Sequence, residues 1–442
     1  MSDNSLNATE SGYFQQSSPE AIFNALSSLK PYLESGRFLG QNNPYYHDAA
    51  SKVKDKFSNA DVVLHDEELI QYLAASIMVH NCEGWSYLSQ AMQSLVRGDT
   101  GAAKHMSYYA ELRASLSILA SQGIGVFNGR NLVVDSSSGI RCFSRKPTHQ
   151  IAWQALEEWS KGPLSGKLFG EEIVAFGIPL KDWMGEFLGA ESLNYTGANF
   201  ISMWGVDLDK FSRDRTSRNE VSYQVNLSHN EKMLEPEEFF GFVSDMWIAS
   251  NPEEAAFRKL DGYLLRSVLR KSYSDKKPVF GTRSYTQVVE ELCHVLDVPS
   301  YVEGFMKDTA EAEFSILAYA KSSRGTFEDY QFLDMLSRAF LLLRLSSASL
   351  LNALSKSGVA AGDVQFWWNS KAYSSGIATL DSLSEDPGED VQEFWYEVDD
   401  AISELSGLDF GKCWKTFQVE NYKNFEPLSR LEKIAWFGMA RA

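Results

Sequence analysis

The stretch DEELIQYLAASIMVHNCEGWSYLSQAMQSLV, residues 66–96, decides the fold class. Leu69, Leu73, Ile77, Trp85 and Leu88 recur at helical spacing and form one apolar stripe. A turn at 98–101 and a second helix over about 102–121 follow. We therefore expect an antiparallel helix pair at the centre of a helical bundle.

Outward from this pair, most of the chain shows the same helical periodicity. Ser18-Pro19-Glu20 is typical of a helix start, with Ser18 as N-cap and Pro19 at the first helical position. The exception is the segment 131–143, whose pattern predicts a small β-hairpin. Further helices are expected over about 45–57, 147–159, 180–187, 236–247, 252–271, 285–295, 299–320, 327–355 and 390–405.

The length of 442 residues exceeds what one compact core usually holds, so we expect two domains. Residues 1–17 are predicted to be a disordered tail, 18–232 an N-terminal helical domain that contains the hairpin, and 233–442 a C-terminal helical domain. The charged, proline-bearing stretch 231–238 marks the boundary. The predicted fold class is therefore mainly α, with two helical bundles.

The segment 327–355 is apolar almost all round, which is typical of a buried central helix. Its most apolar run, 339–343, lies between Arg338 and Arg344 and is too short to cross a bilayer. Residues 1–18 are polar and acidic, unlike a signal peptide. We expect a soluble protein with a cytoplasmic location and no membrane contact.

The net charge is −18, from 59 acidic and 41 basic residues, which disfavours bulk DNA binding. A nucleic-acid contact would have to be confined to a local basic pocket. The four cysteines are far apart and the seven histidines are scattered, so we expect neither a disulfide framework nor a metal site. Phosphate-loop, dinucleotide-binding and hydrolase motifs are absent, and no cofactor is expected.

One polar constellation stands out, in the segment 204–223. On a helix, Arg215, Asn219 and Tyr223 form one row, with Arg213 and Arg218 close by. Guanidinium groups suit phosphate, and a tyrosine hydroxyl can donate a proton. The alternative is a structural network in which neighbouring carboxylates, including Asp214, neutralise the arginines. Because charge runs are more often faces or interhelix locks, this alternative is slightly favoured.

The sequence Arg218-Asn219-x-x-x-Tyr223 resembles the Arg-Asn-x-x-x-His signature of HEPN domains (higher-eukaryote and prokaryote nucleotide-binding), which are helical bundles. The resemblance implies RNA or nucleotide binding and metal-independent RNA cleavage, with Arg218, Asn219 and Tyr223 as catalytic residues. It also implies a role in bacterial antiviral or toxin–antitoxin systems. Tyrosine in place of histidine is a poorer general base near neutral pH, so a version that binds without cleaving is equally open.

A second polar group lies on the helix expected over 102–121. His105, Glu111 and Arg113 are candidate ligand-binding residues that would face the row at 213–223, with Glu111 as the partner of Arg215 or Arg218. A buried network without chemistry is the more common outcome for such residues. The other function that fits the acidity and the missing enzyme motifs is a non-enzymatic regulatory subunit with a protein partner, or a homo-oligomer.

Overall fold

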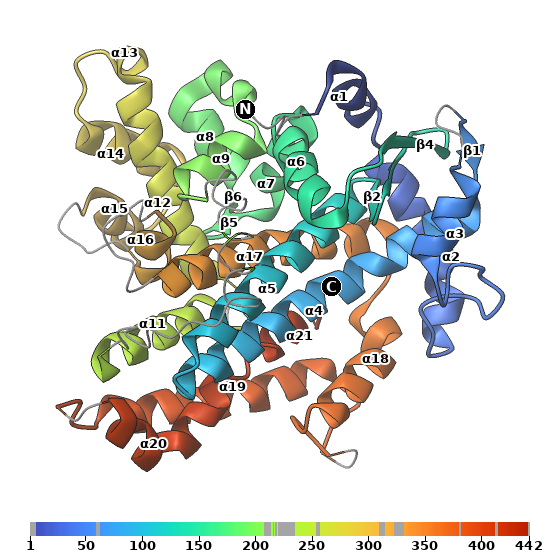
Figure 1. The fold of residues 1–442 in the computed structure, drawn as a ribbon. Coiled ribbons are helices and arrows are strands. Elements are labelled where there is room, and N and C mark those ends of the chain that lie inside the picture. Colours follow the sequence, from blue (N-terminus) through green and yellow to red (C-terminus); the bar gives the residue numbers. More distant parts are fainter. Residues whose placement is uncertain are drawn as a thin grey trace.

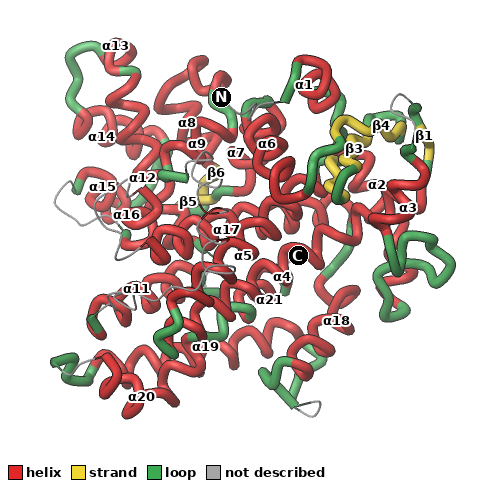
Figure 2. Tube along the Cα trace, viewed as in Figure 1, coloured by secondary structure: helices red, strands yellow, loops and turns green. Residues whose placement is uncertain are grey.

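The structure is a computed structural model and describes most of the chain. The residues described are 6–58, 62–206, 214, 216, 219, 235–252, 257–308, 314–321, 331–379, 382–411 and 414–440. Helices dominate and the sheets are small, as Figure 2 shows. The expected fold class, mainly α, is therefore confirmed.

Three long helices form the centre of the molecule: α4 (Glu67–Val96), α5 (Thr100–Ser121) and α17 (Gln331–Ser357). Asp66 begins α4, because its carboxylate accepts a hydrogen bond from the Leu69 amide. The short turn after α4 sends α5 back along it, and α17 lies against both helices (Figure 1). Most described side chains of α17 are buried, as the sequence predicted, but the helix packs on α4 and α5 and is not the centre of a separate second domain.

Small and polar residues let α17 approach α4 closely. A Cβ atom added at Gly84 would lie 2.6 Å from Cδ2 of Leu343, so a larger residue there would require the Leu343 side chain to move. Asn81 donates hydrogen bonds to the hydroxyls of Ser346 and Ser347, at 2.8 and 3.2 Å. The indole of Trp85 donates to Ser347 at 3.1 Å. These bonds give the amide nitrogen of Asn81 and the indole of Trp85 acceptors inside the core and link the two helices, while Oδ1 of Asn81 is buried without a partner among the described residues.

Two short helices and α2 precede the central pair. The capping box of Asn7 and Glu10 begins α1 (Ala8–Phe14), and Phe14 is buried against Phe143 with ring centroids 4.7 Å apart. Residues 8–14 are thus helical where the sequence predicted a disordered tail, because the cap and one aromatic anchor order them. Ser18 caps α2 (Pro19–Glu34) as predicted, and Asp48 caps α3 (Ala49–Lys56).

The strands form a four-stranded antiparallel sheet in the order β1-β4-β3-β2. The segment expected as a hairpin contains β3 (Arg130–Val134) and β4 (Gly139–Ser144), which pair with Leu132 opposite Cys142. β2 (Ile124–Phe127) and β1 (Leu64–His65) extend the sheet on its two sides. β5 (Val174–Ala175) and β6 (Ile178–Pro179) pair separately.

The remaining helices surround this centre. Those between the sheet and residue 206 are α6 (Thr148–Ser160), α7 (Pro163–Glu172), α8 (Leu180–Leu188), η1 (Gly189–Asn194) and α9 (Gly197–Met203). Those of the second half are α11 (Pro236–Ala249), α12 (Arg258–Asp275), α13 (Lys277–Phe280), α14 (Tyr285–Val295), α15 (Ser300–Lys307), α16 (Ser315–Lys321), α18 (Ala361–Ser374), α19 (Pro387–Ser406), α20 (Trp414–Leu428) and α21 (Lys433–Met439).

Contacts in the core cross the boundary that the sequence predicted between residues 232 and 233. α17 belongs to the second predicted domain, yet it packs on α2, α4 and α5 of the first. One cluster of buried apolar side chains extends through both halves. These contacts give no support for a division at 232, and the two-domain boundary is not confirmed.

Candidate basic ligand pocket

Most of the polar row predicted between residues 213 and 223 lies outside the described residues. Arg213, Arg215, Arg218 and Tyr223 are among those left out. Asn219 is described, and it is helical and exposed. The expected site at this row stays a prediction.

Asp214, which belongs to the same segment, is buried and paired with α17. Nη2 of Arg338 lies 2.6 Å from Oδ2 of Asp214, and Nε of Arg338 lies 3.6 Å from Oε1 of Glu111. Glu111 is fully buried, and neither of its carboxylate oxygens has a hydrogen-bond partner among the described residues. These three charged groups join α5, α17 and the segment after α9 within the core.

Burial raises the pKa of Glu111 well above its ordinary value, and the charge of Asp214 raises it further. The Arg338 guanidinium opposes this shift but lies closer to Asp214. Glu111 therefore tends to hold its proton, while Asp214 carries the charge that balances Arg338. Asp214 thus links its segment to α17 through Arg338. The predicted network, in which Asp214 neutralises the arginines of its own segment, lies outside the described residues.

The other arginine beside the apolar run has a similar structural role. Arg344 forms a bidentate pair with Asp261 of α12, at 3.1 and 2.7 Å. The same Asp261 carboxylate accepts a hydrogen bond from the amide of Val174. Both arginines that flank 339–343 thus tie the central helix to its neighbours.

The three candidate residues of α5 lie in three different surroundings. Glu111 faces Arg338 in the core. Arg113 donates to Nδ1 of His80 at 2.9 Å and pairs with Glu83 at 3.0 Å, both on α4. His105 packs its ring against Tyr109, with centroids 5.1 Å apart. The structure does not bring these three side chains together into one site.

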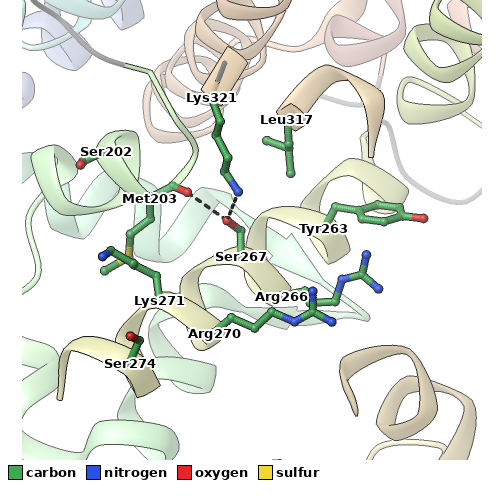
Figure 3. Close-up of a pocket in the computed structure, with 10 residues that line it drawn as sticks. All are labelled: Ser202, Met203, Tyr263, Arg266, Ser267, Arg270, Lys271, Ser274, Leu317 and Lys321. Atoms are coloured by element: carbon green, nitrogen blue, oxygen red, sulfur yellow. Dashed lines mark hydrogen bonds between the residues drawn. The ribbon is translucent and has the colours of Figure 1, made fainter. Parts of the chain in front are cut away.

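A basic pocket of about 450 Å³ lies where α9, α12 and α16 meet. α12 supplies Arg266, Arg270 and Lys271, and α16 supplies Lys321 (Figure 3). Among the described residues that line this basic pocket there is no carboxylate. The other lining residues are Ser202, Met203, Tyr263, Ser267, Ser274 and Leu317.

The two arginines of the basic pocket are one helical turn apart and project to the same side of α12 (Figure 3). Arg266 is buried and lies over the rings of Phe305 and Tyr263, at 4.3 and 4.8 Å, and donates to the Phe305 carbonyl. Arg270 donates to the Asp308 carbonyl, and its Nε is buried without a hydrogen bond to a described residue. These carbonyls and rings orient the guanidinium groups without removing their charge.

The lysines complete the basic lining. Nζ of Lys321 donates to the hydroxyl of Ser267 at 2.9 Å, and that hydroxyl donates to the Met203 carbonyl at 2.9 Å, as the dashed lines in Figure 3 show. Lys271 is exposed and pairs with Asp275 at 3.0 Å. The Ser267 hydroxyl thus accepts from Lys321 and gives its own proton to Met203, so the charged donors beside the arginines are the two ammonium groups.

Sequence reasoning missed this basic pocket. Arg266, Arg270 and Lys271 lie within six residues of the helix expected over 252–271, so their clustering on one helix was visible. Lys321 and Met203 come from distant segments, and only the packing of α9 and α16 on α12 places them there.

Three further findings bear on the kind of protein this is. Within the described ranges, no group of three or more histidine, cysteine, aspartate and glutamate side chains could hold a metal ion. In the same part of the chain, no helix has the length and apolar character needed to cross a membrane. Comparison of the chain with protein-family models, curated proteins and solved structures finds no match.

Proposed function

We propose that this protein binds RNA or a nucleotide through a phosphate group held in the basic pocket of α12 and α16. The observation that carries the proposal is the local charge. Four cationic side chains and no described carboxylate line one pocket of a chain whose net charge is −18. Like charges one helical turn apart repel each other, so Arg266 and Arg270 favour an anion between or beside them.

The donor chemistry favours phosphate over other anions. Guanidinium groups donate in a planar fork that matches phosphate oxygens, and the ammonium group of Lys321, which carries three N–H bonds and gives one to Ser267, can donate to a phosphate from a range of directions. Arg270 donates to the Asp308 carbonyl and Lys321 to the Ser267 hydroxyl, which are both neutral oxygens. A phosphate would thus meet guanidinium groups that are already oriented, which lowers the entropic cost of binding.

RNA cleavage without a metal is the further step that the HEPN resemblance implies, with Arg218 and Tyr223 as the acting residues and a role in antiviral or toxin–antitoxin systems. Incubation of tRNA with the protein and with Arg218→Ala tests this step separately from binding. Cleavage that depends on Arg218 would support it. Binding at the basic pocket without cleavage would leave a protein that holds RNA and does not cut it.

The binding test compares Arg270→Gln and Lys271→Gln with a matched control, Lys259→Gln. Lys259 is an exposed cation on the same helix and does not line the pocket. We expect each pocket variant to weaken tRNA or ATP binding by about tenfold or more, because a charge-assisted hydrogen bond contributes about 1.5–3 kcal/mol. For RNA, the salt dependence of binding should also decrease, since fewer counterions are released.

The control should bind as the unmodified protein does. Equal weakening by Lys259→Gln would mean that RNA responds only to overall charge. Absence of any tRNA or ATP binding by the unmodified protein would remove the proposal.

A further inference from the structure

A second pocket, lined by residues of α3, α4, α5 and β2, has a different chemistry. Its volume is about 370 Å³, at the lower end of the range of about 300–1,000 Å³ that is usual for small-molecule sites. Its floor is apolar and buried, formed by Leu73, Leu116, Ala120 and Ile124. We call it the α3–α4 pocket.

Aromatic rings form one wall of the α3–α4 pocket. The rings of Tyr72 and Phe127 both line it, with centroids 6.0 Å apart and planes inclined by 39°. Tyr45 packs behind Tyr72 at 6.3 Å. Each aromatic ring offers a flat face and an edge, so a planar ligand can stack on one ring and pack edge-on against the other.

The polar lining of the α3–α4 pocket centres on His80 and Arg113. Because arginine can only donate hydrogen bonds, Nδ1 of His80 must accept from Nη1 of Arg113, at 2.9 Å. The proton of the neutral imidazole is therefore on Nε2, so this nitrogen is a hydrogen-bond donor. Burial and the charge of Arg113 lower the pKa of His80 to about 3, so the imidazole stays neutral.

The charge of Arg113 is balanced beside the pocket. Its Nη2 lies 3.0 Å from a carboxylate oxygen of Glu83. Asp48, which also lines the pocket, adds a negative charge at the rim. The α3–α4 pocket thus presents hydrogen-bond donors without a net positive charge.

We infer that the α3–α4 pocket is a second ligand site, for an uncharged planar molecule that carries a hydrogen-bond acceptor, such as an aromatic amide or a nucleobase. In this site the rings of Tyr72 and Phe127 pack against the plane of the ligand. Nε2–H of His80 and the Arg113 guanidinium donate hydrogen bonds to its acceptor atom. A buried donor left without an acceptor costs free energy, which gives the site selectivity for ligands with a carbonyl or ring nitrogen. This inference does not rest on the proposed function, because the two pockets share no lining residue.

Three probes of nearly the same shape test the charge preference: benzamide, benzoate and benzamidinium. Binding is measured on the full chain by saturation-transfer NMR and titration calorimetry. We expect benzamide to bind at least about tenfold more tightly than either charged analogue, since desolvating a charge costs more than desolvating an amide. Benzoate or benzamidinium binding as well as benzamide would overturn the inference, and so would the absence of benzamide binding.

A steric variant tests the location. Ala50→Trp fills the α3–α4 pocket from an exposed position on α3, and Lys54→Trp places the same side chain one turn along that helix, outside the pocket. We expect Ala50→Trp to lose benzamide binding and Lys54→Trp to keep it. Asn128→Trp, at the exposed rim after β2, provides the same test if Ala50→Trp does not fold. Benzamide binding that survives a folded rim variant, or is lost equally in Lys54→Trp, would contradict the location.

Discussion

At the scale of single residues, burial decides which charged groups can act on a ligand. Glu111 and Arg113 are two positions apart on α5, yet Glu111 is fully buried beside Arg338 while Arg113 lines a pocket. The helical period predicts that two such residues face different directions. It does not identify their partners, because Arg338 comes from a helix more than two hundred residues further along the chain.

The raised pKa of Glu111 predicts how stability depends on pH. The folded state keeps a proton that the unfolded state releases above about pH 4.5, so the contribution of Glu111 is complete below that pH and is lost as the pH rises toward the folded pKa. Glu111→Gln removes this dependence, since glutamine does not titrate. The stability of the variant relative to the unmodified protein should therefore increase with pH above 4.5.

Urea unfolding of both proteins at a series of pH values measures this difference. A stability difference between the two proteins that stays constant across the series would mean that Glu111 has the same pKa in the folded and the unfolded protein.

At the scale of elements, local signals predicted the helices well. The cap at Ser18 and the apolar stripe of 66–96 are local features, and α2 begins where that cap lies, while α4 covers the stripe. The segment 299–320 differs, because the pattern predicted one helix and the structure has α15 and α16 with residues 309–313 outside the described ranges.

The close packing of α4 on α17 predicts that alanine substitution of two glycines changes stability in opposite directions. Gly84→Ala adds a methyl group against the buried Leu343, so we expect a loss of about 1–3 kcal/mol in the free energy of unfolding. Gly185→Ala lies within α8 with no atom within 4 Å of its new methyl group. Because alanine favours a helix over glycine, this control should gain up to about 1 kcal/mol.

Chemical denaturation of the two variants measures both changes. Equal effects at the two positions would show that helix propensity alone, and not the contact between α4 and α17, determines the outcome at Gly84.

At the scale of the whole molecule, the sequence predicted the fold class but not how the two halves meet. Apolar periodicity shows that the helix in 327–355 is buried, without showing what buries it. The structure packs α17 on α2, α4 and α5, and the basic pocket also combines segments on both sides of residue 232. No local sequence pattern predicts the packing of α17 or the assembly of the basic pocket.

The shared core predicts the behaviour of a fragment. Residues 1–232 lack α17 and would expose the apolar faces of α4 and α5 to water. We therefore expect this fragment to unfold without a cooperative transition, whereas the full chain unfolds cooperatively. Calorimetry and near-ultraviolet circular dichroism distinguish the two cases. A cooperative transition of the fragment alone would instead support a domain boundary at 232.

The most direct test of the proposed function is lysine footprinting with tRNA bound to the full chain. Acetylation of each lysine is measured by mass spectrometry with and without the RNA, so Lys259 serves as a control inside the same sample. The account predicts that RNA protects Lys271 and Lys321, which line the basic pocket, and leaves the exposed Lys259 of the same helix unchanged. Equal acetylation of Lys271 and Lys321 with and without bound RNA would contradict it.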